Sequence, residues 1–230
     1  MAIIVAFVSK KGGVGKSTLA RALAAVCTRR GLLTTLADLD NEQQTAMHWQ
    51  RLREINAVLP PLTVKAFGNV AAAIASEQDA DVLIVDAPGH APQLTAEIAS
   101  VAHLVVQPCG VGFDDLRPAM DLFYQLAASG VPKSRLLIVL SRILNAEEEQ
   151  AARAYIEVAD FTVLPGSVVE RARYRDAHNR GLAFIESPGE DLNAPAADVL
   201  TSILTSIVQN LGTLNRGPQA LRRPHSPFAL

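Results

Sequence analysis

Cysteine is scarce in this sequence, and its scarcity excludes several kinds of protein. The two cysteines, Cys27 and Cys109, are too few for a framework of disulfides or for a four-ligand cysteine zinc site. We therefore expect a reducing compartment. The apolar run at residues 2–8 is much shorter than the roughly 20 residues of a membrane-spanning helix and has no basic segment before it. We expect a buried strand there, a cytoplasmic protein and no membrane partner.

An excess of either sign of charge is also missing. The sequence has 21 Lys and Arg against 23 Asp and Glu, a formal net charge of −2. No overall basic excess points to nucleic acid, so any such contact must come from a local patch. Because 49% of the residues are hydrophobic and 19% charged, the chain can bury a sizeable core. We expect one domain over residues 1–212.

The last segment, residues 213–230, differs in composition from the rest. It contains three prolines and three arginines and no acidic residue. Its prolines interrupt any amphipathic helix that would anchor the chain to a membrane. We expect a flexible tail, either a solvated end or an accessory contact to phosphate or to a partner.

Secondary structure is predicted from the spacing of apolar residues. Runs of strand length occur at residues 2–8, 32–37, 81–85, 103–107, 136–140 and 161–164. Helical patterns occur at residues 17–30, 114–129, 147–158, 168–180 and 193–211. Strands that alternate with helices predict an α/β fold, with a mostly parallel, twisted sheet covered by helices on both faces.

The most informative segment is KKGGVGKST at residues 10–18, between the first strand and the first helix. Its glycines let backbone N–H groups approach phosphate oxygens, and the start of the helix adds its positive dipole end. We expect Lys16 to neutralise nucleotide phosphates and the Ser17 hydroxyl to bind Mg²⁺. The predicted nucleotide-binding positions are Lys11, Gly12, Gly13, Val14, Gly15, Lys16, Ser17 and Thr18.

This loop departs from the usual pattern G-x-x-x-x-G-K-[ST], because Lys10 replaces the first glycine and a second lysine, Lys11, precedes the glycine pair. In this form it resembles the deviant Walker A box of the ParA/MinD family of P-loop ATPases. The resemblance extends to about residue 212 and implies a P-loop NTPase fold that binds ATP and Mg²⁺. It also implies that Lys11 contacts the phosphates of a partner subunit in an ATP-bound homodimer, as a cation supplied in trans. The alternative is that Lys11 only adds positive potential to its own loop.

Acidic residues follow two of the predicted strands. Asp38 and Asp40 resemble the first switch of the family, although Asn41 stands where the family has proline, which leaves the register of this loop open. The resemblance implies that Asp40 orients the attacking water, with Lys11 and Lys16 as the other catalytic groups, and that Asp38 supports the loop. Asp86 matches Walker B, and Gly89 matches the second switch. The predicted Mg²⁺ ligands are Ser17, Asp40 and Asp86, the carboxylates through water.

Two later loops and one basic segment complete the set of candidate residues. By the resemblance, Arg142 and Pro165 lie in the loops that flank the adenine. Residues 168–180, expected as one helix, carry the candidate DNA-binding residues Arg171, Arg173, Arg175 and Arg180. The alternatives are a plain charged surface, or a contact to nucleotide or partner protein.

The resemblance implies a Mg-dependent ATPase with slow intrinsic turnover that positions DNA or another large cargo. The ATP-bound dimer is expected to bind DNA non-specifically, hence to associate with the nucleoid, until a cargo-bound or centromere-binding adaptor stimulates hydrolysis. The alternatives are a MinD-like spatial regulator, a metabolic ligase of the dethiobiotin-synthetase or cobyrinic-acid amidation type, and a binding module that does not hydrolyse nucleotide. A redox ATPase like the nitrogenase iron protein is disfavoured, because Cys27 is expected in the core of the first helix.

Overall fold

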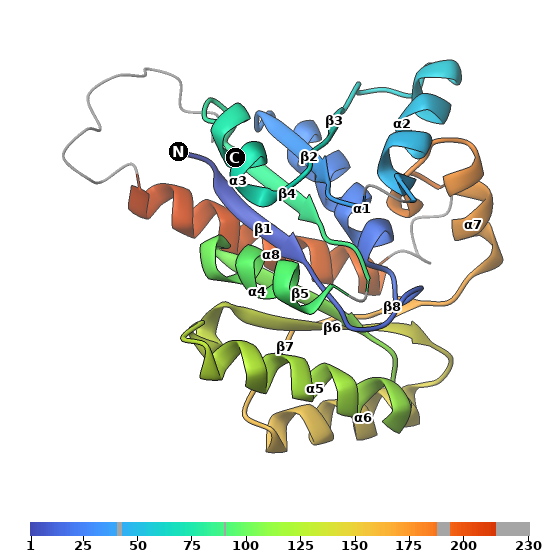
Figure 1. The fold of residues 1–230 in the computed structure, drawn as a ribbon. Helices are drawn as coiled ribbons and strands as arrows, with labels where there is room; N and C mark the ends of the chain where they lie inside the picture. Colours follow the sequence, from blue (N-terminus) through green and yellow to red (C-terminus); the bar gives the residue numbers. More distant parts are fainter. Residues whose placement is uncertain (41–42, 90, 188–193, 215–230) are drawn as a thin grey trace.

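The fold is built around a parallel sheet with helices on both faces (Figure 1). The computed structural model describes residues 1–40, 43–89, 91–187 and 194–214. Seven strands lie in the order β3-β2-β4-β1-β5-β6-β7, and β8 pairs with β6. Their bounds are β1 (Ile3–Phe7), β2 (Thr34–Asp38), β3 (Thr63–Ala66), β4 (Val82–Asp86), β5 (Leu104–Cys109), β6 (Leu136–Ile143), β7 (Thr162–Val163) and β8 (Val168–Val169).

The helices form two layers that cover the sheet. The α-helices are α1 (Lys16–Arg29), α2 (Thr45–Ile55), α3 (Val70–Ser76), α4 (Pro92–Val101), α5 (Phe113–Ala128), α6 (Ala146–Val158), α7 (Ala172–Asn179) and α8 (Ala194–Leu214). The short 3₁₀ segments η1 (Lys133–Arg135) and η2 (Phe184–Glu186) lie between them. This arrangement confirms the predicted α/β fold class.

Alternate residues of β1 contribute to two separate hydrophobic cores. Ile3, Val5 and Phe7 pack into the core that includes α1 and α8. Ile4 and Ala6 pack into the core that includes α4 and α5. A strand buried on both faces has no polar alternation, which explains why the first strand is a continuous apolar run.

The register of the sheet brings three strand ends together. Phe7 at the end of β1 lies opposite Asp86 of β4, and Asp38 of β2 lies opposite the same residue. The loops that follow β1, β2 and β4 therefore leave one edge of the sheet side by side. In open α/β sheets this carboxyl edge is where ligands bind.

Two parts of the sequence-based prediction need correction. No element was predicted between residues 38 and 80 or at residues 92–101, where the structure has α2, β3, α3 and α4. The helix predicted over residues 168–180 is wrong at its start, because residues 168–169 form β8 and the helix runs from Ala172 to Asn179. The backbone groups of residues 168–169 pair with β6 and so are satisfied without the hydrogen bonds of a helix.

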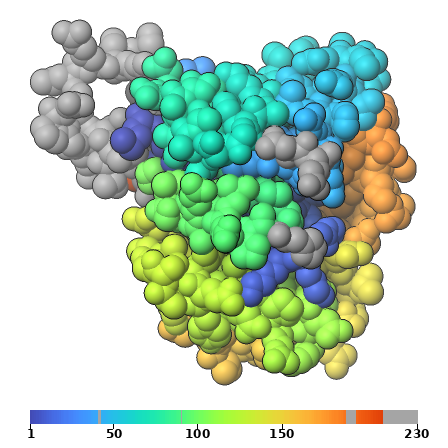
Figure 2. Space-filling model, viewed as in Figure 1, coloured from blue at the N-terminus to red at the C-terminus, as the bar shows by residue number. Residues whose placement is uncertain are grey.

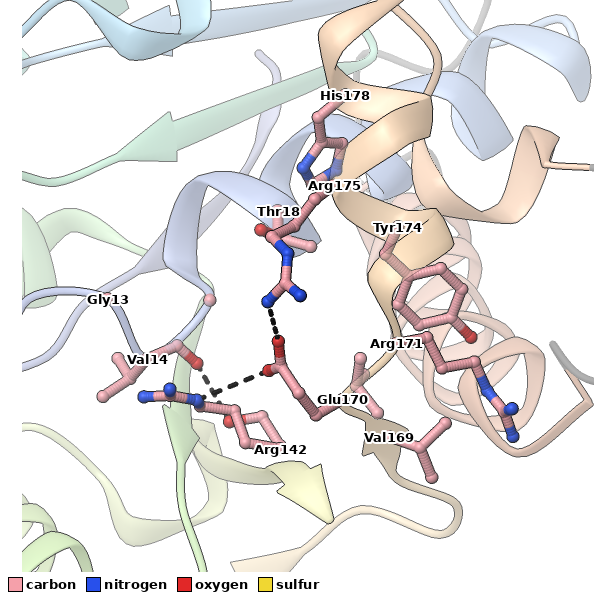
Figure 3. A pocket seen from close by; sticks show the side chains of 13 residues that line it. Gly13, Val14, Thr18, Arg142, Val169, Glu170, Arg171, Tyr174, Arg175 and His178 are labelled. Atoms are coloured by element: carbon pink, nitrogen blue, oxygen red, sulfur yellow. Dashed lines mark hydrogen bonds and ion pairs between the residues drawn. The ribbon is translucent and has the colours of Figure 1, made fainter. Parts of the chain in front are cut away.

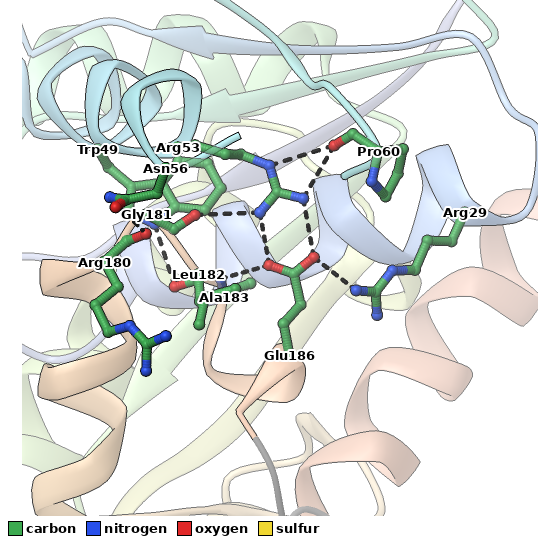
Figure 4. A network of polar contacts seen from close by, with 10 residues as sticks. All are labelled: Arg29, Trp49, Arg53, Asn56, Pro60, Arg180, Gly181, Leu182, Ala183 and Glu186. Carbon is green, nitrogen blue, oxygen red and sulfur yellow. Dashed lines mark hydrogen bonds and ion pairs between the residues drawn. The ribbon is translucent and has the colours of Figure 1, made fainter. Parts of the chain in front are cut away.

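A buried polar network ties α2 to the segment that follows α7 (Figure 4). Arg53 forms a bidentate ion pair with Glu186, with N–O distances of 2.6 and 2.9 Å, and both side chains are 2% exposed. Arg53 also donates to the carbonyls of Pro60 and Gly181. The indole N–H of Trp49 donates to the carbonyl of Leu182 at 3.2 Å. These contacts fix the position of α2 relative to residues 181–186.

Candidate nucleotide-binding site

The loop between β1 and α1 has the backbone of a phosphate cradle. Gly13 and Gly15 have φ values of 73° and 105°, a region that side chains disfavour, and a Cβ at either position would meet nothing within 4 Å. Backbone conformation rather than lack of space therefore requires glycine here. No side chain of the described residues caps the N-terminus of α1, so the first N–H groups of this helix are available to an anion.

Lys16, the first residue of α1, is buried beneath this loop. Its Nζ donates to the Ser9 Oγ at 3.0 Å. Burial lowers the pKa of Lys16, and the carboxylates of Asp86 and Asp40 oppose this shift. Gly89 lies beside the same ammonium, since a Cβ at Gly89 would be 3.9 Å from the Lys16 Nζ. The structure thus places the predicted second switch against the phosphate loop.

Asp86 ends β4 as a buried carboxylate, 2% exposed. Burial raises the pKa of Asp86 to about 6, and the Ser17 hydroxyl, Arg21 and Lys16 offset part of this rise. Within the described part of the chain, neither of its oxygens has a hydrogen-bond partner of ordinary geometry. A carboxylate without partners, near a hydroxyl, fits a hydrated Mg²⁺.

The protein groups alone do not form a complete cage for a metal. Among the described residues, no group of three or more His, Cys, Asp and Glu side chains gathers in a metal-binding arrangement. Mg²⁺ usually takes one or two carboxylates and fills its remaining positions with water and phosphate. Ser17 and Asp86 therefore suit a Mg²⁺ that arrives with a nucleotide.

Asp38 shapes the loop that leads from β2 to α2. Its Oδ1 accepts the N–H of Asp40 at 3.1 Å, and its Oδ2 accepts the N–H groups of Ala46 at 3.0 Å and Met47 at 3.3 Å. Asp40 is partly exposed, and its Oδ1 accepts the N–H of Gln43 at 2.9 Å. This geometry agrees with a supporting role for Asp38. The question of register falls on residues 41–42, which lie outside the described residues.

Lys11 points away from its own loop. Its Nζ lies 2.7 Å from the Oδ1 of Asp115, in the first turn of α5, and its side chain is 41% exposed. In the space-filling view, dark blue atoms of the N-terminal part of the chain reach the surface beside the green atoms of the α4 and α5 region (Figure 2). The second lysine therefore sits at the rim of the site.

A cavity of about 200 Å³ lies on the other side of the phosphate loop (Figure 3). Gly13, Val14, Gly15 and Thr18 form one wall, and residues of β6, β8 and α7 form the opposite wall. Arg142 lines this cavity, whereas Pro165 is exposed in the loop after β7 and is not among the lining residues. Of the two positions expected beside the base, the structure thus places Arg142 at the cavity and Pro165 outside its lining.

The four arginines of the basic segment have different surroundings. Arg171 precedes α7 as its N-cap, so the expectation that Arg171 lies within the helix is wrong. Arg171 and Arg175 both line the cavity, and Arg175 pairs with Glu170 at 2.9 Å. Arg173 is partly buried, whereas Arg180 is exposed and forms no ion pair among the described residues.

Three residues of the site were not identified from the sequence. Asp115 and Glu170 are charged partners whose contacts appear only in three dimensions. Arg21, one turn after Ser17 in α1, is buried, donates to the Thr45 carbonyl at 2.6 Å and lies over the Trp49 ring. An arginine among the apolar residues of the first helix was the one signal in the sequence for this contact.

Comparison with known proteins decides the family. The model described as the CobQ/CobB/MinD/ParA nucleotide binding domain matches residues 5–184. The chain belongs to this family. The match confirms the resemblance to ParA/MinD ATPases on which the site was predicted. No curated protein matches the chain.

Solved structures with the same fold support the assignment. MinD from Aquifex aeolicus has a TM-score of 0.68 and 16% identity, over 89% of this chain and 98% of that one. An ATP complex of a McdA variant from Cyanothece has a TM-score of 0.66 and 16% identity, over 90% and 96%. A putative plasmid partition protein from Borrelia burgdorferi bound to AMPPNP has a TM-score of 0.63 and 14% identity, over 89% and 99%. At such identities the likeness establishes the fold alone, that of ParA/MinD-like ATPases.

Among the described residues, no helix is both long and apolar enough to cross a bilayer.

Proposed function

We propose that this chain is a Mg-dependent ATPase that converts ATP and water to ADP and phosphate and uses the cycle as a switch. The observation that carries this proposal is the convergence of Lys16, Asp40 and Asp86 at one edge of the sheet, around an uncapped helix start. The buried carboxylate of Asp86, the hydroxyl of Ser17 and the carboxylate of Asp40 would hold Mg²⁺ and its waters. When bound, Mg²⁺ neutralises charge on the β- and γ-phosphates.

The protein groups around this edge would position the reactants. Lys16 would contact the β- and γ-phosphates, and the backbone N–H of Gly89 would contact the γ-phosphate. Asp40 would accept a hydrogen bond from the attacking water and orient it. Asp38 holds the loop that carries Asp40 by accepting three hydrogen bonds from backbone N–H groups. Loss of the γ-phosphate would therefore change the conformation of that loop.

The position of Lys11 supports a dimeric switch. Its ammonium is exposed at the rim and held by one surface ion pair rather than by its own loop, so it is available to the nucleotide of a second copy. A cation supplied in trans stabilises charge that develops during phosphoryl transfer. The ATP-bound dimer would bind DNA non-specifically and position DNA or another cargo, until an adaptor protein stimulates hydrolysis and releases it.

Exposed arginines of the segment 171–180 would provide the DNA contact. Arg180 is the member of the basic segment that is both exposed and without an ion pair in the described structure. Loss of a single phosphate contact lowers non-specific affinity without changing sequence preference. We expect Arg180→Ala to weaken DNA binding and to flatten its salt dependence, whereas Arg117→Ala on α5 leaves both unchanged.

The test is a titration of fluorescent duplex DNA of unrelated sequence with ATPγS, with ADP and without nucleotide, at low and higher salt. Lys11→Ala is compared with wild type and with Lys10→Ala, which removes the same charge one residue away. Binding that needs ATPγS, falls steeply with salt and is lost only in Lys11→Ala supports the proposal. If ATP binds but DNA does not bind in any state, the DNA-based function is wrong, and the MinD-like and ligase alternatives replace it.

A further inference from the structure

A second hydroxyl lies beside Ser17, the residue that would bind Mg²⁺. Thr45 is the first residue of α2, and its Oγ1 lies 3.3 Å from the Oγ of Ser17 in the first turn of α1. Both residues are half-buried, so the protein encloses neither hydroxyl completely. The two residues are 28 positions apart in the sequence, and only the packing of α2 against α1 brings their hydroxyls together.

The distance between these two oxygens suits two neighbouring ligands of one Mg²⁺. Mg²⁺ takes oxygen ligands in near-ideal octahedral geometry at about 2.0–2.1 Å, so adjacent ligands lie about 3 Å apart. The Ser17 hydroxyl is also next to the Asp86 carboxylate. That carboxylate is 2% exposed and has no hydrogen-bond partner of ordinary geometry among the described residues. Two hydroxyls and a buried, unpartnered carboxylate therefore gather where a hydrated Mg²⁺ would lie.

Arg21 and Asp38 hold the backbone of Thr45 in place. The Nη2 of Arg21, a buried residue of α1, donates to the Thr45 carbonyl at 2.6 Å. The Oδ2 of Asp38 accepts the N–H of Ala46 at 3.0 Å. This carbonyl and this N–H belong to the same peptide group, so two different elements fix the peptide that follows Thr45. The Thr45 side chain is thereby directed at Ser17.

We propose that the Thr45 hydroxyl is a further ligand of the nucleotide-bound Mg²⁺, next to Ser17. This inference rests on the proposed ATP-binding function. The hydroxyl would take one of the positions that water otherwise fills around Mg²⁺. Because Thr45 begins α2, the bound metal would also tie the start of this helix to the nucleotide. Arg21 is then a positioning residue, since it acts on the metal through Thr45.

The first experiment measures how much Mg²⁺ strengthens nucleotide binding. A fluorescent ATP analogue is titrated with wild type, Thr45→Val and Thr45→Ser, in Mg²⁺ and in EDTA. Thr45→Val removes the hydroxyl and is expected to reduce the gain in affinity from Mg²⁺ about tenfold, the lower end of the range for loss of a group that supports a bound metal. Its affinity in EDTA is expected to match wild type. Thr45→Ser keeps the hydroxyl and is expected to retain most of the gain.

A matched control and the EDTA titration separate metal binding from a structural role. Thr201→Val removes a hydroxyl from an exposed position of α8 and is expected to behave as wild type. A purely structural role of Thr45 would lower the affinity in Mg²⁺ and in EDTA by the same factor. That result, or an equal gain from Mg²⁺ in Thr45→Val and wild type, would overturn the proposal. If wild type binds the analogue in neither condition, the proposed function itself fails.

Trp49 provides a second readout of the link between the metal and α2. It is the one tryptophan of the sequence, and it lies one turn after Thr45 in α2. The guanidinium carbon of Arg21 lies 5.4 Å from the centre of its ring, so a shift of this turn changes the charge beside the indole. Wild-type fluorescence is expected to change when Mg²⁺ and ATPγS are added together, and Thr45→Val is expected to show a much smaller change. Equal changes in the two proteins would contradict the link through Thr45.

Discussion

The Nζ of Lys11 lies 2.7 Å from the Oδ1 of Asp115, a residue 104 positions away in the sequence. The side chains are 41% and 34% exposed, and ion pairs of this exposure contribute roughly 0.2 to 1 kcal/mol. In the proposed dimer, Lys11 would exchange this partner for the nucleotide of the other subunit. The pair therefore acts as a weak restraint on the proposed dimer.

Removal of that restraint gives the first prediction. Asp115→Asn is expected to tighten ATPγS-dependent dimerisation by about twofold to fivefold, the affinity equivalent of a surface ion pair. Sedimentation velocity over a range of protein concentrations measures the effect. Asp114→Asn is the matched control, because Asp114 lies in the same first turn of α5. Equal shifts in the two variants would show that net charge, not release of Lys11, is responsible.

The second prediction concerns pH and the histidine at the end of α7. Burial, aided by Arg21, lowers the pKa of His178 from 6.5 to about 4. Between these values the unfolded chain binds a proton that the folded chain does not, so the unfolding free energy falls as pH decreases. From pH 7.5 to pH 5.0 this group is expected to cost about 2 kcal/mol.

Urea unfolding at the two pH values tests this prediction. His178→Gln is expected to lose about 2 kcal/mol less than wild type between pH 7.5 and pH 5.0. His48→Gln, which changes an exposed histidine, is expected to follow wild type. A pH dependence in His178→Gln that equals that of wild type would assign the effect to other groups.

The first part of the site could be predicted from the sequence because its signals are local. The strand, the glycine loop and the helix follow one another within residues 3–29, and the two lysines and the glycines of the loop are adjacent in the chain. Asp86 could be placed because an apolar strand precedes it. These features need no knowledge of distant partners.

The rest depends on contacts that join distant segments. The helix α2 escaped prediction because its buried positions are Ala46, Trp49 and Arg53, so a charged residue occupies a core position. The strand β3 is a four-residue edge strand with one buried residue, Val64. β8 forms only by pairing with β6, and Glu170 reaches the cavity because that pairing ends one residue earlier. Pairing between segments far apart in sequence leaves no periodic signal.

Two glycines with left-handed backbone allow a controlled test of packing. Gly181 has φ of 73°, and a Cβ there would lie 2.2 Å from the backbone nitrogen of Arg53. Gly130 has φ of 98°, and a Cβ there would meet nothing within 4 Å. Gly130→Ala is expected to cost about 1 kcal/mol from backbone strain alone. Gly181→Ala must also displace α2 and is expected to cost about 3 kcal/mol or more. Equal losses in urea unfolding would contradict a close contact at Gly181.

The ion pair between Arg53 and Glu186 leads to the last prediction. Both side chains are 2% exposed, and removing one partner leaves an uncompensated buried charge, at a cost of about 3 to 5 kcal/mol. Arg29 also contacts Glu186 at 2.8 Å, so we expect Arg53→Met to lose about 3 kcal/mol, at the lower end of this range.

The double variant Arg53→Met with Glu186→Met is expected to recover much of the loss seen in Arg53→Met, because it removes the unpaired carboxylate. Lys133→Met, which breaks the exposed pair with Asp160, serves as the control and is expected to have little effect on unfolding by urea. If the double variant is no more stable than Arg53→Met, the loss comes from the other contacts of Arg53, namely the carbonyls of Pro60 and Gly181. The network would then hold α2 through backbone hydrogen bonds rather than through its buried charges.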